Sequence, residues 1–312
     1  MQGEYVCCNG RDAAKYVKME EEAKSRDARG TKMRVAIYGK GGIGKSTIAS
    51  NLSVGLAAEG KKVLHIGCDP KGDSCRTIMG REIPDFVQML GEKGDTLKPE
   101  DVIFAGLNGV NCLEVGGPKS GSGCAGMGIN AMNAMLERFG IWQKDWDYII
   151  YDVLGDVVCS GFSTAMRDGY ADLVYIVTSA EYMSLYAANA LVRALREIGN
   201  GRANFGGFIF NRCQNTWEQE VLREFLKRTN GREAGRIPAS SEIRKADYAQ
   251  IPILKLQEEN QDSEVKTAFV RLLEQVKKGE GCVPKSLSAA ELADFRHLCL
   301  EKEEMWNGIS ED

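Results

Sequence analysis

The stretch MRVAIYGKGGIGKST, residues 33–47, carries the strongest fold signal in the sequence. The apolar run MRVAIY leads directly into GKGGIGKST, which matches the phosphate-binding pattern G-x-x-x-x-G-K-[ST]. The glycines of this pattern allow successive backbone N–H groups to turn toward a phosphate. The helix expected from Ser46 would place its positive end at the same point. The stretch therefore predicts a strand, a phosphate-binding loop and a helix, in that order.

Each residue of this loop has an expected role. Lys45 is expected to reach the β- and γ-phosphates of a bound nucleotide, and Ser46 is expected to hold Mg²⁺. The predicted nucleotide-binding residues of the loop are Gly41, Gly42, Ile43, Gly44, Lys45, Ser46 and Thr47. A loop that acts within one chain needs one lysine, so the second lysine, Lys40, requires a separate explanation.

Apolar segments alternate with helical patterns along most of the chain. The expected strands are 33–38, 61–68, 109–116, 148–153, 171–179 and 205–210. The expected helices are 46–60, 129–140, 186–199 and 216–230. Near-continuous apolar strands separated by amphipathic helices indicate a mostly parallel sheet with helices on both faces. The predicted fold is thus a doubly wound α/β domain, a P-loop NTPase of the two-lysine type.

Charged side chains follow two of the expected strands. The strand YIIYDV ends in Asp152, the expected second acidic group near Mg²⁺. The segment GCDPKGDS, residues 67–74, adds Asp69, Lys71 and Asp73. Ligands of such sheets bind beyond the carboxyl ends of the strands, so we expect these residues beside the nucleotide. The alternative for the segment is an ordinary solvated turn.

Composition restricts the function classes. The chain has 312 residues, of which 43% are hydrophobic and 27% charged, as is typical of a soluble globular protein. A net charge of −4 gives no basic footprint for nucleic acid. No apolar run reaches the roughly 18 residues of a membrane span, and the first 32 residues contain no apolar signal region. The expected location is the cytoplasm, with no nucleic-acid or membrane partner.

Three parts of the chain are distinguished. Residues 1–32 are a charged N-terminal extension that is expected to be flexible, and its Cys7–Cys8 pair is either a metal site or two free thiols. Residues 33–280 form the predicted domain, and residues 281–312 form an acidic helical tail. Ten cysteines are many for a cytosolic chain, so metal or redox use gains weight, yet no C-x-x-C is present. Cys68 and Cys112 lie in apolar strands and are expected in the core.

Four segments together resemble the nitrogenase iron protein family. They are GKGGIGKST, GCDPKGDS, GGPKSGSGCAGMGI (116–129) and DVLGDVVCSGF (152–162), in the family's order and spacing over about residues 33–290. The resemblance implies a homodimer in which Lys40 approaches the nucleotide bound across the subunit interface. A cation supplied in this way would stabilise the charge that develops on a transferring phosphoryl group.

The resemblance also implies an iron–sulfur cluster. Four thiolates hold a [4Fe–4S] cluster, and Cys124 and Cys159 from each of two chains supply four on a two-fold axis. One cluster per homodimer follows. The catalytic residues that the resemblance implies are Lys40, Asp69 and Asp156, where Asp156 helps to position the attacking water and Asp69 belongs to the other nucleotide switch.

Two further nucleotide contacts are implied by the resemblance. Asn211 matches the family's base-recognising asparagine, although an asparagine after a strand is equally well explained as a turn residue. Pro238 falls where the family has a loop over the adenine, but the family's usual aspartate is absent there. Both residues are carried as expected nucleotide contacts.

The implied function is ATP-dependent electron transfer. The chain would take an electron from a low-potential ferredoxin or flavodoxin and, coupled to MgATP hydrolysis, reduce a nitrogenase-like catalytic protein complex. Met127 stands where the family usually has an arginine that docks on this partner, and Lys119-Ser-Gly replaces an acidic E-P-G. These departures favour a nitrogenase-like branch, whose relatives reduce tetrapyrroles, cofactor F430 precursors or sulfur compounds, over a dedicated dinitrogen-fixing system.

Two other function classes remain as alternatives. Chromosome-partitioning and cell-division-site ATPases share the two-lysine loop, but they lack the DVVC-GF cysteine and usually bind DNA or membrane. Iron–sulfur carrier ATPases assemble clusters on other proteins and typically use a C-x-x-C near the carboxyl end, which this sequence lacks.

Overall fold

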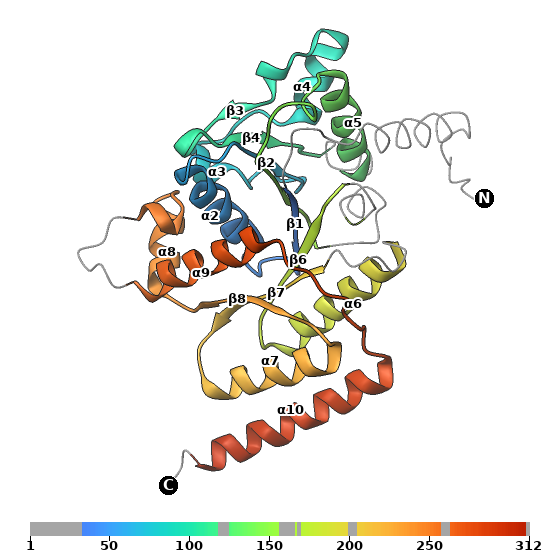
Figure 1. The fold of residues 1–312 in the computed structure, drawn as a ribbon, viewed down its shortest axis with the longest axis vertical. Helices are drawn as coiled ribbons and strands as arrows, with labels where there is room; N and C mark the ends of the chain where they lie inside the picture. Colours follow the sequence, from blue (N-terminus) through green and yellow to red (C-terminus); the bar gives the residue numbers. More distant parts are fainter. Residues whose placement is uncertain are drawn as a thin grey trace, which may run out of the picture.

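One eight-stranded sheet organises the molecule in the computed structural model, which describes residues 33–117, 125–155, 166, 170–198, 205–256 and 263–309 (Figure 1). The strand order is β3-β4-β2-β5-β1-β6-β7-β8. The strands are β1 (Met33–Gly39), β2 (Val63–Gly67), β3 (Phe104–Ala105), β4 (Asn111–Glu114), β5 (Tyr148–Asp152), β6 (Leu173–Thr178), β7 (Phe205–Cys213) and β8 (Glu233–Pro238). Every neighbouring pair is parallel except β3 with β4.

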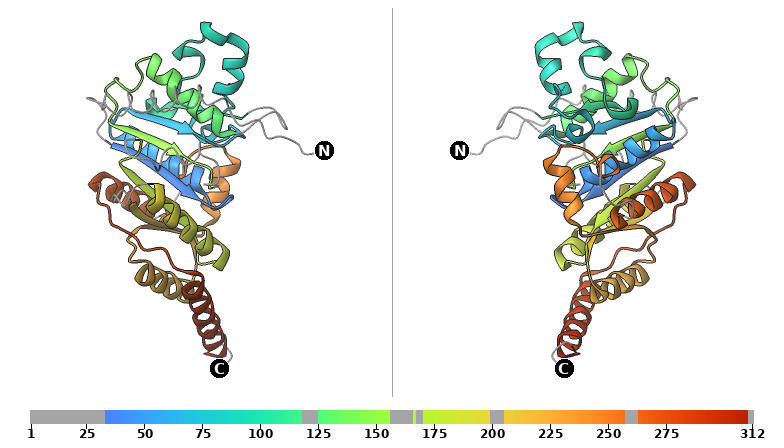
Figure 2. Two further views of the ribbon diagram at one scale, coloured as in Figure 1. Left: turned by 90° about the vertical axis from the view of Figure 1, so that its right-hand side faces the viewer. Right: turned by 90° about the vertical axis from the view of Figure 1, so that its left-hand side faces the viewer.

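Helices cover both faces of this sheet. The α-helices among the described residues are α2 (Lys45–Ala58), α3 (Arg76–Met79), α4 (Phe86–Lys93), α5 (Ala125–Arg138), α6 (Tyr182–Ile198), α7 (Thr216–Thr229), α8 (Ser241–Tyr248), α9 (Glu264–Lys278) and α10 (Ala289–Ile309). Helices α2 and α9 share one apolar core with the strands, and α5, α6 and α7 share the other (Figures 1 and 2). The predicted doubly wound α/β fold is confirmed.

The alternation of side chains along each strand produces these two cores. On β1, Val35 and Ile37 face the α2 side, whereas Ala36 and Tyr38 face the α5 and α6 side, and all four are fully buried. A parallel strand covered on both faces must be apolar on both, which explains the unbroken run that opened the sequence. Cys68 and Cys112 are buried, as predicted for core residues.

Local signals fix several helix ends. Asn215 accepts a hydrogen bond from the backbone N–H of Glu218, whose side chain bonds back, so a capping box begins α7. Ser263 caps α9, and Gly279, with φ of +66°, ends it. Helix α9 is missing from the expected helices although it carries both signals.

Strand β8 was also not predicted. Its sequence EAGRIP contains only two fully buried apolar side chains, Ala234 and Ile237. It is one of the two edge strands, so one side of its backbone has no neighbouring strand in the sheet and a continuous apolar run is not required. The strand therefore escapes a search for apolar segments.

The amino end of α10 packs into the apolar core that α5, α6 and α7 share. The Phe295 ring lies 5.8 Å from that of Phe225 on α7, and Asp294 accepts a 2.7 Å hydrogen bond from Arg228. Farther along, α10 projects from the rest of the molecule (Figure 2). Among the described helices, none combines the length and the apolar character needed to cross a membrane.

Candidate functional site

The phosphate-binding loop lies where β1 ends and α2 begins. Gly39, Gly42 and Gly44 have φ of +154°, +74° and +99°, which L-residues with a side chain rarely adopt. A Cβ on Gly44 would collide with the amide nitrogen of Asn211. The loop is thus held in a conformation that leaves its backbone exposed at Gly41 and Gly42, while Ile43 is buried beneath it.

Lys45 is the buried cation of the site. Only 8% of the residue is exposed, and its Nζ donates a 3.4 Å hydrogen bond to the carbonyl oxygen of Lys40. Burial lowers its pKa, and the nearby carboxylates of Asp152, Asp69 and Asp73 oppose that shift. The structure therefore brings together the predicted lysine and three of the predicted acids around one point.

Asp152 is the buried acid of the site, at the end of β5. Burial raises its pKa, and the hydroxyls of Ser46 and Ser74 offset part of this shift. Its Oδ2 accepts a 2.5 Å hydrogen bond from Ser74, whereas its Oδ1 has no hydrogen-bond partner among the described residues. A buried carboxylate oxygen without a partner is costly, and a water bound to Mg²⁺ would satisfy it. The residues present therefore fit Mg²⁺ near Ser46 and Asp152.

Four of the predicted residues at this edge of the sheet are exposed or half-buried. Lys40 and Lys71 are exposed, as is Asp73, and Asp69 is half-buried. The Asp69 carboxylate accepts a 3.0 Å hydrogen bond from the backbone N–H of Lys71, which closes the turn after β2.

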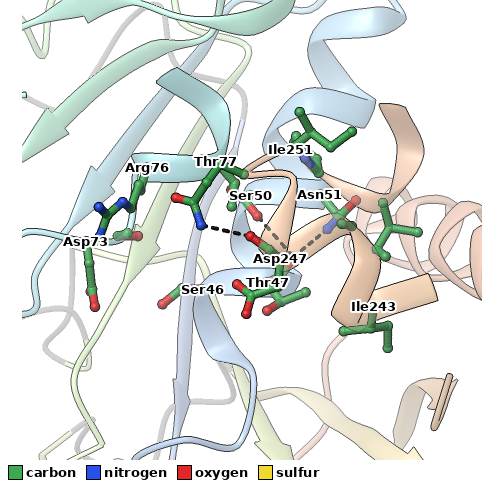
Figure 3. Close-up of a pocket in the computed structure, with 15 residues that line it drawn as sticks. Ser46, Thr47, Ser50, Asn51, Asp73, Arg76, Thr77, Ile243, Asp247 and Ile251 are labelled. Atoms are coloured by element: carbon green, nitrogen blue, oxygen red, sulfur yellow. Dashed lines mark hydrogen bonds between the residues drawn. The ribbon is translucent and has the colours of Figure 1, made fainter. Parts of the chain in front are cut away.

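A cavity of about 240 Å³ opens beside the first turn of α2 (Figure 3). Ser46, Thr47 and Asp73 line one part of it, and Ile243 and Asp247 of α8 line another. The cavity therefore adjoins the proposed metal position and extends toward α8, which follows Pro238.

Two residues near the end of β7 donate hydrogen bonds to backbone carbonyls of the phosphate-binding loop. Asn211 is buried, and its Nδ2 donates a 2.7 Å hydrogen bond to the carbonyl oxygen of Ile43. Its Oδ1 accepts from the backbone N–H of Arg212, whose guanidinium donates to the Gly42 carbonyl at 2.7 Å. Pro238 pairs with the neighbouring end of β7. Both polar ends of the Asn211 amide are thus engaged by the protein. The contribution of Arg212 was missed, since nothing in FNRCQN indicates a contact 170 residues away.

Three predicted site residues, Asp156, Cys124 and Cys159, lie outside the described residues, as do Cys7, Cys8 and Lys119. The described segments that lead toward the two cysteines are nevertheless closely packed, one on the phosphate-binding loop and the other on the turn after β2. A Cβ on Gly155 would collide with the carbonyl oxygen of Gly39 and would lie 3.3 Å from the Lys40 Cα. A Cβ on Gly117 would lie 2.7 Å from the Cβ of Pro70, next to Asp69.

A second buried acid lies close to the site and was not predicted. Glu114 at the end of β4 is 1% exposed, and one of its carboxyl oxygens accepts a hydrogen bond from the backbone N–H of Cys75. Its other oxygen, which lies against Gly67, has no partner among the described residues. Burial raises the pKa of Glu114 to about 8, so the group is mostly protonated at neutral pH.

Comparisons with solved structures support the fold. The septum site-determining protein MinD complexed with Mg-ADP from Pyrococcus horikoshii is 22% identical, with a TM-score of 0.61 over 80% of this chain and 96% of that one. MinD from Aquifex aeolicus is also 22% identical, with a TM-score of 0.59 over 82% of this chain and 100% of that one. At this identity the similarity shows a shared P-loop α/β fold alone.

Sequence comparisons show the family. Nitrogenase iron protein 2 of Methanothermobacter thermautotrophicus is 41% identical over 264 residues, which cover 84% of this chain and 96% of that protein. The nitrogenase iron protein of Methanococcus voltae is 42% identical over 77% of this chain and 86% of that protein. The model of the 4Fe-4S iron sulfur cluster binding proteins of the NifH/frxC family matches residues 33–302. This chain therefore belongs to the NifH/frxC family of iron–sulfur cluster binding proteins.

Proposed function

We propose that this chain is the ATP-dependent electron-transfer component of a nitrogenase-like system. It acts in the cytoplasm as a homodimer that shares one [4Fe–4S] cluster and couples MgATP hydrolysis to reduction of a separate catalytic protein complex. Family membership supports the cluster and the reductase role. The observation that carries the coupling is the packing of Gly155, in the segment that leads to Cys159, against Gly39 of the nucleotide loop.

Lys45, Ser46 and Asp152 bind the nucleotide in this proposal. The Lys45 ammonium group is almost fully buried, so its attraction for the β- and γ-phosphates is screened less than it would be at the surface. Ser46, through its hydroxyl oxygen, and Asp152, through Oδ1 and a water, would hold Mg²⁺, which would neutralise charge on the phosphates. Thr47 and the exposed backbone of Gly41 and Gly42 complete the phosphate contacts. A lysine left buried without phosphate is costly, which favours the bound state.

Lys40, Asp69 and Asp156 act in hydrolysis. Lys40 is exposed and therefore free to extend to the nucleotide of the second subunit, where it would stabilise charge on the transferring phosphoryl group. Asp156 orients the attacking water. Asp69 lies in the turn after β2 and belongs to a second segment that changes with the state of the nucleotide. Asn211 and Pro238 border the base, with Asn211 acting through the loop carbonyl that it holds.

Cys124 and Cys159 of each subunit hold the cluster. When bound, a [4Fe–4S] cluster accepts and gives up one electron at low potential. The chain itself supplies thiolates on two segments that start at the nucleotide edge of the sheet. Gly155 begins one of them, in contact with Gly39, so a movement of the loop is passed directly to the backbone that leads to Cys159.

The docking partner is a nitrogenase-like catalytic complex, and the electron donor is a ferredoxin or flavodoxin. Met127 lies in the first turn of α5 and is 62% exposed, close in sequence to Cys124. A thioether cannot form the ion pair that an arginine forms, so this part of the docking surface is less polar. The chain thus fits a nitrogenase-like branch.

The first experiment tests the cluster and its link to nucleotide. The protein is purified without oxygen and reduced, and its EPR spectrum is recorded with and without MgATP. The expected result is a [4Fe–4S]⁺ signal at one cluster per dimer that MgATP changes. Cys159→Ser should abolish the signal, and Cys299→Ser, a cysteine outside the proposed ligand set, should not. ATPase activity in a cluster-free wild type would instead favour a partitioning-type switch.

Gly155→Ala tests the mechanical link. The added methyl group cannot fit against the Gly39 carbonyl, so either the loop or the cysteine-bearing segment must shift. We expect the cluster to remain and the EPR change caused by MgATP to be lost. Gly91→Ala is the matched control, because a Cβ at Gly91 on α4 meets nothing within 4 Å. An unchanged MgATP response in Gly155→Ala would refute the coupling.

A further inference from the structure

A buried chain of hydrogen bonds leads from helix α2 to Asp152. Ser53 Oγ lies 2.8 Å from His65 Nδ1, and His65 Nε2 lies 2.9 Å from Ser74 Oγ. Ser74 Oγ donates a 2.5 Å hydrogen bond to Asp152 Oδ2. None of the four residues is more than 2% exposed. The chain thus connects three elements, since Ser53 is on α2, His65 on β2 and Asp152 on β5.

The direction of every hydrogen bond follows from the acceptor at its end. An ionised Asp152 can only accept, so Ser74 uses its single hydroxyl hydrogen on Oδ2. Ser74 Oγ must then accept the N–H of His65 Nε2. The imidazole is neutral, since burial lowers the pKa of His65 to about 3, so Nδ1 is unprotonated and accepts the Ser53 hydroxyl. A single tautomer satisfies every group in the chain.

We propose that His65 is a positioning residue that acts through Ser74 to fix the Asp152 carboxylate, with Oδ2 held by the protein and Oδ1 left for the metal-bound water. This inference rests on the proposed function. Without the His65 N–H, Ser74 Oγ would have no donor directed at it and its hydroxyl could turn away from Asp152. Either carboxylate oxygen could then face the metal.

The series of hydrogen bonds also connects Asp152 to the helix that begins at the phosphate-binding loop. Lys45 and Ser46 are in the first turn of α2, and Ser53 is two turns farther along the same helix. The partners of Mg²⁺ on β5 and on α2 are therefore held relative to one another by His65, which lies between the two elements. Groups that orient a metal's partners in this way typically alter metal affinity about 10–100-fold when they are removed.

The test separates positioning from simple core packing. In full-length protein purified without oxygen, the Mg²⁺ concentration that gives half-maximal binding of a fluorescent ATP analogue is measured. The affinity for a fluorescent ADP analogue is measured in EDTA. His65→Leu keeps a side chain of roughly similar size and removes the hydrogen bonds to Ser53 and Ser74. We expect a roughly tenfold higher Mg²⁺ requirement and an affinity in EDTA within about twofold of wild type.

Two matched variants complete the design. In His65→Gln the amide can accept from Ser53 and donate to Ser74, so it should restore most of the Mg²⁺ response. Leu64→Ala disturbs the same strand on its opposite face and should lower the melting temperature without shifting the Mg²⁺ requirement. If His65 served only to pack the core, His65→Leu would lower the melting temperature, the Mg²⁺ affinity and the affinity for the ADP analogue together.

An unshifted Mg²⁺ requirement in His65→Leu, or an equal defect in His65→Gln, would overturn the inference. Should His65→Leu fail to fold, Ser53→Ala is the second variant, because it removes only the hydrogen bond between Ser53 and His65. It should raise the Mg²⁺ requirement about two- to threefold, and no shift in that variant would also overturn it. A wild type without Mg²⁺-dependent binding of ATP refutes the proposed function, whereas a wild type that binds MgATP, together with unshifted variants, refutes this inference alone.

Discussion

The two halves of the sheet bury different chemistry. Around β1, β2 and β5 the buried side chains include a set of polar and ionisable groups, namely Lys45, Ser53, His65, Ser74, Glu114 and Asp152. Around β7 the buried side chains include an aromatic cluster with ring centroids 4.9–6.2 Å apart, which consists of Phe205, Phe208, Phe210, Phe225 and Phe295. Both halves belong to one continuous sheet.

This difference separates binding from stability. Burial of large aromatic side chains is strongly favourable, and its free energy does not depend on the charge of a bound ligand. The β7 half therefore acts as a rigid support. Burial of polar groups contributes little net stability, but it leaves atoms such as Asp152 Oδ1 in need of a partner. A ligand can therefore change the energy of the first half without unfolding the second.

Phe225→Ala should have the largest effect, and it should act on stability. Phe225 is fully buried between Phe208 and Phe295, so its truncation should lower the free energy of unfolding by about 3–5 kcal/mol. ATPase activity per folded molecule should be unchanged. Urea unfolding and ATPase assays on the same samples check both statements. Val270→Ala, at a half-exposed site on α9, is the control, and a selective loss of activity in Phe225→Ala would contradict the separation.

Lys45→Met should have the reverse effect. Loss of the buried ammonium group should reduce ATPase activity roughly 10²–10³-fold, because it removes a preorganised charge from the phosphate site. The stability of the nucleotide-free protein should not fall and should rise slightly, because burial disfavours the charged lysine and lowers its pKa. Lys62→Met, which removes an exposed partner of Asp145, is the control. Activity within tenfold of wild type would remove Lys45 from the mechanism.

The same division explains how much the sequence could predict. The strand, loop and helix at residues 33–47, and Asp152 at the end of β5, follow from local patterns, because phosphate binding demands glycines and a helix N-terminus in sequence order. The fold class followed from the apolar strands of the central sheet. The edge strand β8 did not, because edge position removes the need for apolar residues.

Contacts between distant segments could not be predicted. His65 is one polar residue in an apolar strand, and only the fold brings it to Ser53 and Ser74. Asn211 was predicted beside the base, and its local sequence contains nothing that indicates a hydrogen bond to Ile43, 168 residues away. Such polar pairs depend on the spacing of α2 and the strands, which residue patterns do not encode.

Two buried groups of the polar half should shape the pH dependence of stability. Burial raises the pKa of Glu114 from 4.5 to about 8, so between these values the folded chain keeps a proton that the unfolded chain has lost. The free energy of unfolding then falls as pH rises. His65, whose pKa is lowered from 6.5 to about 3, has the opposite effect, and its contribution increases stability up to pH 6.5. From about pH 6.5 to 8, Glu114 therefore acts without opposition from His65.

Glu114→Gln should remove the loss of stability in that window. Wild type should lose up to about 2 kcal/mol between pH 6.5 and 8, from ~1.4 kcal/mol per pH unit for one proton. The variant should show a flatter curve. Urea unfolding of the nucleotide-free protein at several pH values in this range checks the prediction. The exposed Glu100→Gln should follow wild type, and parallel curves for Glu114→Gln and wild type would show that Glu114 is ionised throughout.

The smallest effect concerns the contact between the two halves. Arg212 lies on β7, has φ of +62°, and donates a hydrogen bond to Gly42 in the phosphate-binding loop. A non-glycine residue at such φ costs roughly 1–2 kcal/mol, and the greater freedom of glycine in the unfolded chain costs about 0.5–1 kcal/mol. Arg212→Gly should therefore be more stable than Arg212→Ala by about 0.5–1 kcal/mol.

Nucleotide affinity should separate the two roles of Arg212. Both variants lose the guanidinium, so both should bind a fluorescent ADP analogue more weakly, by a factor below about ten, for a hydrogen bond of 0.5–1.5 kcal/mol. If the two affinities are equal while the stabilities differ, the backbone strain belongs to the β7 half and the loop contact to the nucleotide half. If the affinity follows the stability instead, Arg212 transmits strain from the aromatic half into the loop, and the two halves are energetically coupled at this residue.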